Sequence, residues 1–299
     1  MHDWNSPTEL QRDIDITTKL VNIWMGLYLW EMVTSMGFER AVIKKMRVLQ
    51  WQTAPYFISR YSYMIALLCY GTVMNSMSRA NCSTLHAVFF FFETSIVFAS
   101  TCFALRTMAI WNNRFVTRGL WTIVAGHAVL VVISTLQSRA VWNESLAACV
   151  YLDPSRAYLI VAIARVYTVV LDALILTLNV YKLRVGFMAS RDKGQRGLVW
   201  VLLEQGLIYF IIAFLCNVTA VGFLIWKPNF LIGIIATTPA SMFTVIVACR
   251  SVRNLSDFVA QECQGAYRLP TIATGPMEFT NSIASEGEVR NLTKIIHEK

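Results

Sequence analysis

The chain has 299 residues, of which 56% are hydrophobic and only 15% are charged, and its formal net charge is +8. Soluble domains average about 25% charged residues, so this composition excludes an ordinary water-soluble protein. The basic residues lie between apolar segments and form no single patch, which argues against a nucleic-acid partner.

Seven apolar segments follow one another along the chain and predict seven transmembrane helices. A helix needs roughly 20 mostly apolar residues to cross a bilayer, and only helices and closed barrels satisfy their backbone hydrogen bonds in lipid. The predicted spans are Thr18–Phe38, Thr53–Met74, Thr84–Trp111, Leu120–Leu136, Ala157–Tyr181, Leu198–Trp226 and Phe230–Ala248. The expected fold is therefore all-α, a polytopic bundle with its membrane domain over residues 18–249.

The basic residues predict which end of the bundle faces the cytosol, because cytosolic connections carry an excess of Lys and Arg. They concentrate after the first, third and fifth spans and in the tail. We therefore expect residues 1–17 outside and the C-terminus in the cytosol. Residues 250–263 place apolar side chains on one helical face, which predicts an amphipathic helix on the inner membrane surface. Residues 264–299 are expected to be a disordered cytosolic tail.

Two cysteines lie on the predicted extracytosolic side, where disulfides persist. Cys82 directly precedes the third span, and Cys149 lies in the connection between the fourth and fifth spans. A bridge between them would hold that connection across the mouth of the bundle, and the alternative is two free thiols. The same connection contains Asn143-Glu-Ser, which matches the acceptor motif for N-glycosylation and makes Asn143 the expected site.

Ionisable residues within the spans form two groups by depth, and such residues are functional candidates because their burial in lipid is costly. Glu93 and Arg165 lie at similar depth in the outer half, where they form the natural ion pair. Asp172 shares a helix face with Arg165, about two turns deeper. These three residues could line a cavity that opens to the outside and binds a ligand or moves a proton.

A second group of ionisable residues lies in the inner third of the predicted bundle. Two acids and two bases at one depth are expected to neutralise one another, either as structural ties between helices or as part of a functional network. The members are Glu31, Arg60, Arg106 and Glu204.

Several short motifs resemble those of a large fungal family of seven-helix membrane proteins, abundant in mushroom-forming fungi and known as a domain of unknown function. The matching residues are Leu29-Trp30-Glu31, Glu39, Arg60-Tyr61, Leu105-Arg106 to Trp111, Leu171-Asp172 to Lys182, Leu203-Glu204 to Phe210, Cys249-Arg250 and Asn254-Leu255. The resemblance covers about residues 25–255 and implies the seven-helix fold and its topology. Some members of this family lie near secondary-metabolite gene clusters, so the resemblance also implies a biosynthetic role as an alternative.

Two function classes follow from these observations. The first is a receptor-like or sensory protein of the plasma membrane or endoplasmic reticulum, with a small-molecule ligand and a cytosolic partner at the loop 182–196 and the tail. The second is a membrane enzyme, such as a terpene or meroterpenoid cyclase, in which a buried acid protonates an apolar substrate. Its candidate acids are Glu93, Asp172, Glu204 and Glu31. Neither class requires a metal or a cofactor, and a transporter is less favoured because no internal repeat is visible.

Overall fold

A computed structural model describes residues 7–44, 53–75, 82–111, 113–137, 140–143, 148–151, 154–190, 198–226 and 230–267. The chain divides into a unit of Met1–Ala260 and a second unit of Gln261–Lys299. Of the second unit, the structure describes only the end of the last helix, and the predicted disordered tail otherwise lies outside the described residues.

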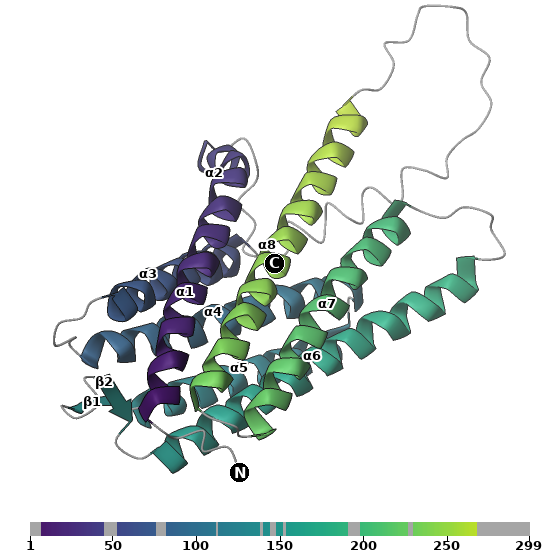
Figure 1. The fold of residues 1–299 in the computed structure, drawn as a ribbon. Helices are drawn as coiled ribbons and strands as arrows, with labels where there is room; N and C mark the ends of the chain where they lie inside the picture. The colour runs from purple at the N-terminus through teal and green to yellow at the C-terminus, as the bar shows by residue number, and fades with distance from the viewer. Residues whose placement is uncertain are drawn as a thin grey trace, which may run out of the picture. The chain divides into compact units, whose positions relative to one another are not determined.

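The first unit is built almost entirely of helices (Figure 1). The elements are α1 (Pro7–Thr34), α2 (Met36–Ile43), α3 (Thr53–Asn75), α4 (Cys82–Trp111), α5 (Arg114–Gln137), β1 (Ala140–Asn143), β2 (Ala148–Tyr151), α6 (Pro154–Ser190), α7 (Leu198–Trp226) and α8 (Phe230–Tyr267). Each predicted span lies within one helix, except that the first is divided between α1 and α2.

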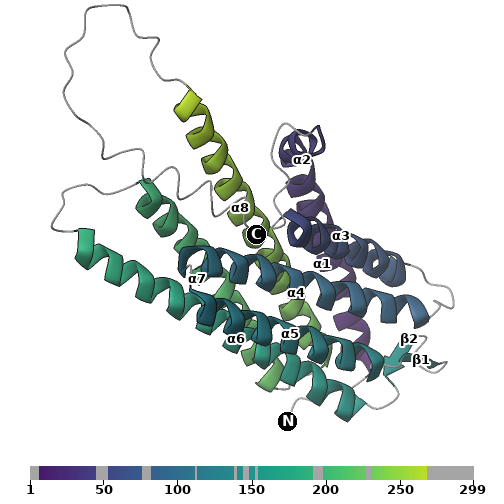
Figure 2. The same ribbon diagram turned by 180° about the vertical axis from the view of Figure 1, so that it is seen from behind.

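Helix α4 is the centre of the packing, since it contacts α3, α5 and α6, while α6 also contacts α7 (Figure 2). Side-chain contacts show the directions of the helices. Asn22 of α1 hydrogen-bonds Asn75 at the end of α3, while Arg60 in the first half of α3 donates to the carbonyl of Met32 near the end of α1. Helices α1 and α3 are therefore antiparallel, as an up-and-down bundle requires.

The first predicted span is broken at Ser35, a break that the sequence analysis does not predict. The Ser35 hydroxyl donates to the carbonyls of Glu31 and Met32, at 2.6 and 3.2 Å. Such bonds to the preceding turn compete with the helical ladder and bend helices. The break turns α2 so that Glu39 is buried against α3, where it contacts Arg60.

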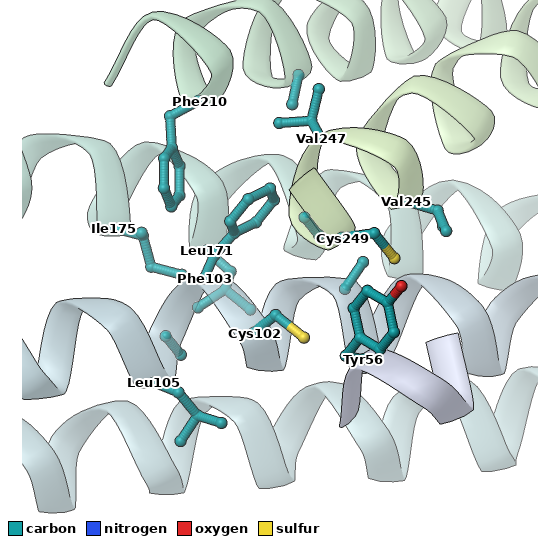
Figure 3. Close-up of a cluster of buried hydrophobic side chains, with 14 of the residues drawn as sticks. Tyr56, Cys102, Phe103, Leu105, Leu171, Ile175, Phe210, Val245, Val247 and Cys249 are labelled. Atoms are coloured by element: carbon teal, nitrogen blue, oxygen red, sulfur yellow. The ribbon is translucent and has the colours of Figure 1, made fainter. Parts of the chain in front are cut away.

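Aromatic and aliphatic side chains from several helices form the core (Figure 3). Phe103 of α4 and Phe210 of α7 lie with ring centroids 4.1 Å apart. Leu171 and Ile175 of α6 are buried in the same cluster. Burial of these side chains draws α4, α6 and α7 together, and dispersion contacts rather than release of water supply most of the attraction where the surroundings are lipid.

The outer surface of the first unit is strongly apolar while its interior contains charged groups. Trp30 and Phe115 are 71% and 82% exposed, whereas Glu93 and Asp172 are only 2% and 5% exposed. A water-soluble protein shows the reverse arrangement. The distribution is the one expected when lipid, rather than water, surrounds the helices.

Three helices in the described part are long and apolar enough to cross a membrane: Thr84–Trp111, Arg114–Gln137 and Leu159–Val185. A shorter apolar stretch, Phe210–Ile225, lies within α7. The structure therefore supports membrane association through α4, α5 and α6, and it leaves the other predicted spans as expectations.

The C-terminal segment differs from the predicted separate surface helix. Residues 250–263 continue α8 without a break, so the amphipathic pattern belongs to the end of a long helix. Arg250 and Arg253 both contact Glu31 of α1, and Ser251 accepts a hydrogen bond from Arg106 of α4. These contacts hold the part of α8 just beyond the predicted span against α1 and α4. The apolar pattern of the sequence alone does not predict them.

The connection between α5 and α6 contains a short antiparallel hairpin that was not predicted. Strands β1 and β2 pair with Trp142 opposite Cys149 and Asn143 opposite Ala148. The side chains of Cys82, Cys149 and Asn143 lie outside the described residues, so the disulfide and the glycosylation site stay predictions. The cysteines whose side chains are described, Cys69, Cys102, Cys216 and Cys249, are free.

Replacement of Tyr63 by Phe is expected to lower the free energy of unfolding by about 1 kcal/mol. The fully buried Tyr63 hydroxyl donates to the Thr238 carbonyl at 3.0 Å, so its loss removes a bond between α3 and α8. The measurement is unfolding of the purified protein by sodium dodecyl sulfate. Tyr181→Phe is the matched control, because Tyr181 is exposed and stacks on Trp111 through its ring. Equal stability of Tyr63→Phe and wild type would show that the hydrogen bond from Tyr63 to the Thr238 carbonyl does not stabilise the fold.

Candidate functional site

Two parallel helices carry polar side chains at matching seven-residue intervals. Helix α4 has Glu93, Ser100 and Thr107, and helix α6 has Arg165, Asp172 and Asn179. Residues seven apart lie on nearly the same face of an α-helix, since seven residues make about two turns. Each set therefore forms one polar stripe. We call the two facing stripes the polar track, and its three levels the outer, middle and inner layers.

The outer layer is the ion pair between Glu93 and Arg165. The Arg165 Nη2 atom lies 2.5 Å from Glu93 Oε1, and the Glu93 side chain is 2% exposed. The other terminal nitrogen of Arg165 lies 3.5 Å from the Ser241 hydroxyl of α8. The pairing expected from the depths of Glu93 and Arg165 is present, and its role in ligand or proton chemistry stays a proposal.

The inner layer is a neutral hydrogen bond between the same two helices. The Asn179 amide donates to the Thr107 hydroxyl at 3.1 Å. One turn further along α4, the Trp111 indole donates to the Leu178 carbonyl, and its ring stacks on that of Tyr181. These contacts extend the pairing of α4 and α6 to the end of α4.

The middle layer contains Asp172, which turns away from Arg165 and contacts α7. The Asn217 amide donates to Asp172 Oδ2 at 2.8 Å, and the Asn217 carbonyl oxygen accepts from Thr244 of α8 at 3.3 Å. The prediction grouped Asp172 with Glu93 and Arg165. Asp172 does lie two turns from Arg165 on the same face, but its hydrogen bond joins α6 to α7 and α8.

A branch of the polar track reaches α5 through His127. The Thr168 hydroxyl lies 3.0 Å from His127 Nε2 and also donates to the Ala164 carbonyl. Tyr167 donates to the Ile123 carbonyl of α5 at 2.9 Å. Helix α6 thus makes polar contacts with α4, α5, α7 and α8 from residues close together on its surface.

The inner group of charges has different partners from those predicted. Arg60 lies 2.7 Å from Glu39 Oε1 and also donates to Ser35. Glu31 pairs with Arg250 and Arg253 of α8, each at 2.7 Å. The expectation that Glu31, Arg60, Arg106 and Glu204 neutralise one another is therefore wrong for Glu31 and Arg60. The reason is that α2 and the extension of α8 supply closer partners.

Arg106 and Glu204 are the other two members of that inner group. Arg106 is 9% exposed and donates through Nη1 to the Ser251 hydroxyl at 2.5 Å, so it ties α4 to α8. The Glu204 side chain lies outside the described residues. A pocket of about 10 Å³, room for about one water molecule, lies beside Arg106 and Ser251.

Several polar residues of the site were missed in the sequence. The sequence places Glu39 only in a motif, and it assigns no role in the site to Ser100, Asn217 or Thr244, whose side chains are uncharged. The seven-residue repeat of polar residues in α4 was a usable signal for Ser100 and Thr107. No comparable signal indicates that Asn217 contacts Asp172, since that contact depends on how α7 packs against α6.

No protein-family model matches the chain, and a comparison with curated proteins finds no match. The resemblance to the fungal seven-helix family therefore stays a proposal. In the described part of the chain, no group of three or more His, Cys, Asp or Glu side chains could hold a metal ion.

Breaking the outer ion pair from one side is expected to destabilise the protein by about 3–5 kcal/mol, because Glu93→Gln leaves the Arg165 charge buried and unpaired. The double variant Glu93→Gln/Arg165→Met should recover much of this loss, since it removes both charges. The measurement is a double-mutant cycle on the free energy of unfolding. If the two single effects simply add in the double variant, the pair does not contribute as the structure indicates.

Proposed function

We propose that this chain is a seven-helix integral membrane protein with a receptor-like function, related to the fungal family its motifs resemble. Its N-terminus lies outside and its C-terminus in the cytosol of the plasma membrane or the endoplasmic reticulum. The apolar exterior, the antiparallel α1 and α3 and the basic connections at one end support this proposal. The contacts between motif residues, Glu39 with Tyr61 and Glu31 with Arg250, support the relation to the family.

The observation that carries the proposal is the polar track between α4 and α6. From Arg165 to Asn179 it covers about 21 Å along α6, most of the thickness of a bilayer core. Its layers contact α7 and α8 on the way, and a branch contacts α5. A ligand that separates Glu93 from Arg165 at the outer layer would change contacts shared by these helices. The helices would then also shift at the inner layer, because the same helices carry both ends of the polar track.

The ligand and partner follow from the same arrangement. The ligand is a small molecule with an apolar body, which enters from outside and offers a carboxylate or a similar acceptor to Arg165 in place of Glu93. A cytosolic partner would meet the basic loop 182–196 and the tail. Near that end, the Glu31 pairs with Arg250 and Arg253 join α1 to α8, so movement of α8 would reach the cytosolic surface.

A biosynthetic membrane enzyme is the second candidate, and one observation favours it. Asp172 Oδ1 is buried and has no hydrogen-bond partner among the described residues, as an acid that protonates a substrate would need. Glu93 and Glu31 are less suited, because each is engaged with arginine and a proton donor must be in the acid form. Asp172 is therefore the acid on which a protonation-initiated cyclase would depend.

The orientation is tested with the acceptor site in the hairpin. We expect the protein made in a eukaryotic host to carry one N-glycan that glycosidase treatment removes, because β1 lies on the extracytosolic side in the proposed topology. Asn143→Gln should abolish the shift in electrophoretic mobility. Glycosylation at the C-terminal end, where Asn291-Leu-Thr also matches the motif, would contradict this topology, whereas a glycan that persists in Asn143→Gln would only move the acceptor to Asn81 on the same side.

The receptor-like function is tested by ligand stabilisation. Small amphipathic carboxylic acids are screened for those that raise the unfolding temperature of the purified protein. A true ligand should lose its effect on Arg165→Met and keep it on Arg184→Met, a control on the exposed surface of the same helix. Equal stabilisation of both variants would contradict binding at the outer layer.

The enzyme alternative is tested by metabolite profiling of a host that expresses the protein with prenyl precursors supplied. The receptor-like proposal expects no new product. A new product that disappears with Asp172→Asn, in membranes shown to contain the folded variant, would replace it with the cyclase.

A further inference from the structure

The middle layer of the polar track lacks the bond that joins α4 and α6 in the layers beside it. Glu93 contacts Arg165 and Thr107 contacts Asn179, and in both pairs the two residues are 72 positions apart. The same register places Ser100 opposite Asp172. Yet Ser100 Oγ and Asp172 Oδ1 are both buried without a hydrogen-bond partner among the described residues.

The burial of these two oxygens is nearly complete, with Ser100 at 0% and Asp172 at 5% exposure. Buried polar atoms are normally satisfied by protein groups, water or ions, and each unsatisfied atom destabilises the fold. Two such atoms at one level, from facing stripes, indicate a bound species between them. The neighbouring layers show that α4 and α6 are already in register there.

The charges of the polar track leave one negative charge uncompensated. Glu93 and Asp172 are acids, and Arg165 is the base that faces them, already engaged with Glu93. Asp172 itself forms no ion pair within the described part of the chain, and its other oxygen accepts only from the neutral Asn217. An isolated carboxylate inside a membrane protein is costly unless a positive charge balances it.

We propose that the middle layer binds a sodium ion between Ser100 of α4 and Asp172 of α6. A carboxylate and a hydroxyl are hard oxygen ligands, which suit alkali and alkaline-earth cations. One carboxylate balances one positive charge, which favours a monovalent ion over calcium or magnesium. Asn217, held by Thr244, fixes the second oxygen of Asp172, so the ion would also couple α7 and α8 to the site.

This proposal is compatible with the receptor-like function and excludes the cyclase, because a cyclase needs Asp172 in its acid form with Oδ1 free for the substrate. A sodium ion there would stabilise the arrangement in which α4, α6 and α7 are packed together. Any ligand or substrate that changes this packing would then alter the affinity for sodium, and sodium would alter the affinity for that ligand to the same extent.

The test is the unfolding temperature of the purified full-length protein in detergent at fixed pH. Sodium chloride is exchanged for N-methyl-D-glucamine chloride at constant ionic strength. We expect a saturable rise in unfolding temperature with sodium in the wild type, since binding to the folded state stabilises it. Ser100→Ala should shift the sodium dependence to concentrations about tenfold higher, equivalent to about 1.4 kcal/mol of binding energy.

Asp172→Asn removes the charge at constant shape and should abolish the sodium dependence. Asp15→Asn, an exposed acid on α1, is the matched control and should keep it. An equal sodium effect on wild type and Asp172→Asn would overturn the proposal. So would an unfolding temperature that ignores sodium but changes with pH through Asp172, because a proton would then supply the missing charge. If Asp172→Asn does not fold, the Ser100→Ala titration decides alone.

Discussion

The arginine of α6 can remain inside the helix bundle only because a carboxylate of α4 lies beside it. Arg165 and Glu93 meet at 2.5 Å with almost no exposure of the acid, so neither charge can turn to solvent without movement of a helix. Since an unpaired charge in this setting is far more costly than any single packing contact, the pair determines the register of α4 against α6. The same register brings Thr107 to Asn179 and Ser100 opposite Asp172.

A second set of charges holds the opposite end of the first unit together. Arg60 binds Glu39 because the break at Ser35 turns α2 towards α3, and Glu31 binds two arginines because α8 continues beyond its predicted end. The charged ends and the polar track therefore limit how α1 and α8 can move relative to α4.

This arrangement connects the proposed functions to one physical feature. Apolar side chains cover the outside, where they suit lipid, and polar groups lie inside, where each partner comes from a different helix. A change in the contacts of one layer must therefore alter the positions of several helices. A receptor requires such coupling between its binding site and distant helix ends. The same enclosed acid, Asp172, is the group that a cyclase would use, so both functions and the proposed sodium site meet at α6.

The sequence by itself determined the class of the protein, because the length and spacing of apolar segments are set by the bilayer and can be read without knowledge of contacts. It also predicted the Glu93–Arg165 pair, since depth along a helix follows from residue counts. Tertiary structure decided the partners of Glu31 and Arg60, the contact of Asp172 with Asn217 and the continuity of α8. These depend on which helix faces lie against each other, and the rotation of each helix arises from packing that no single segment encodes.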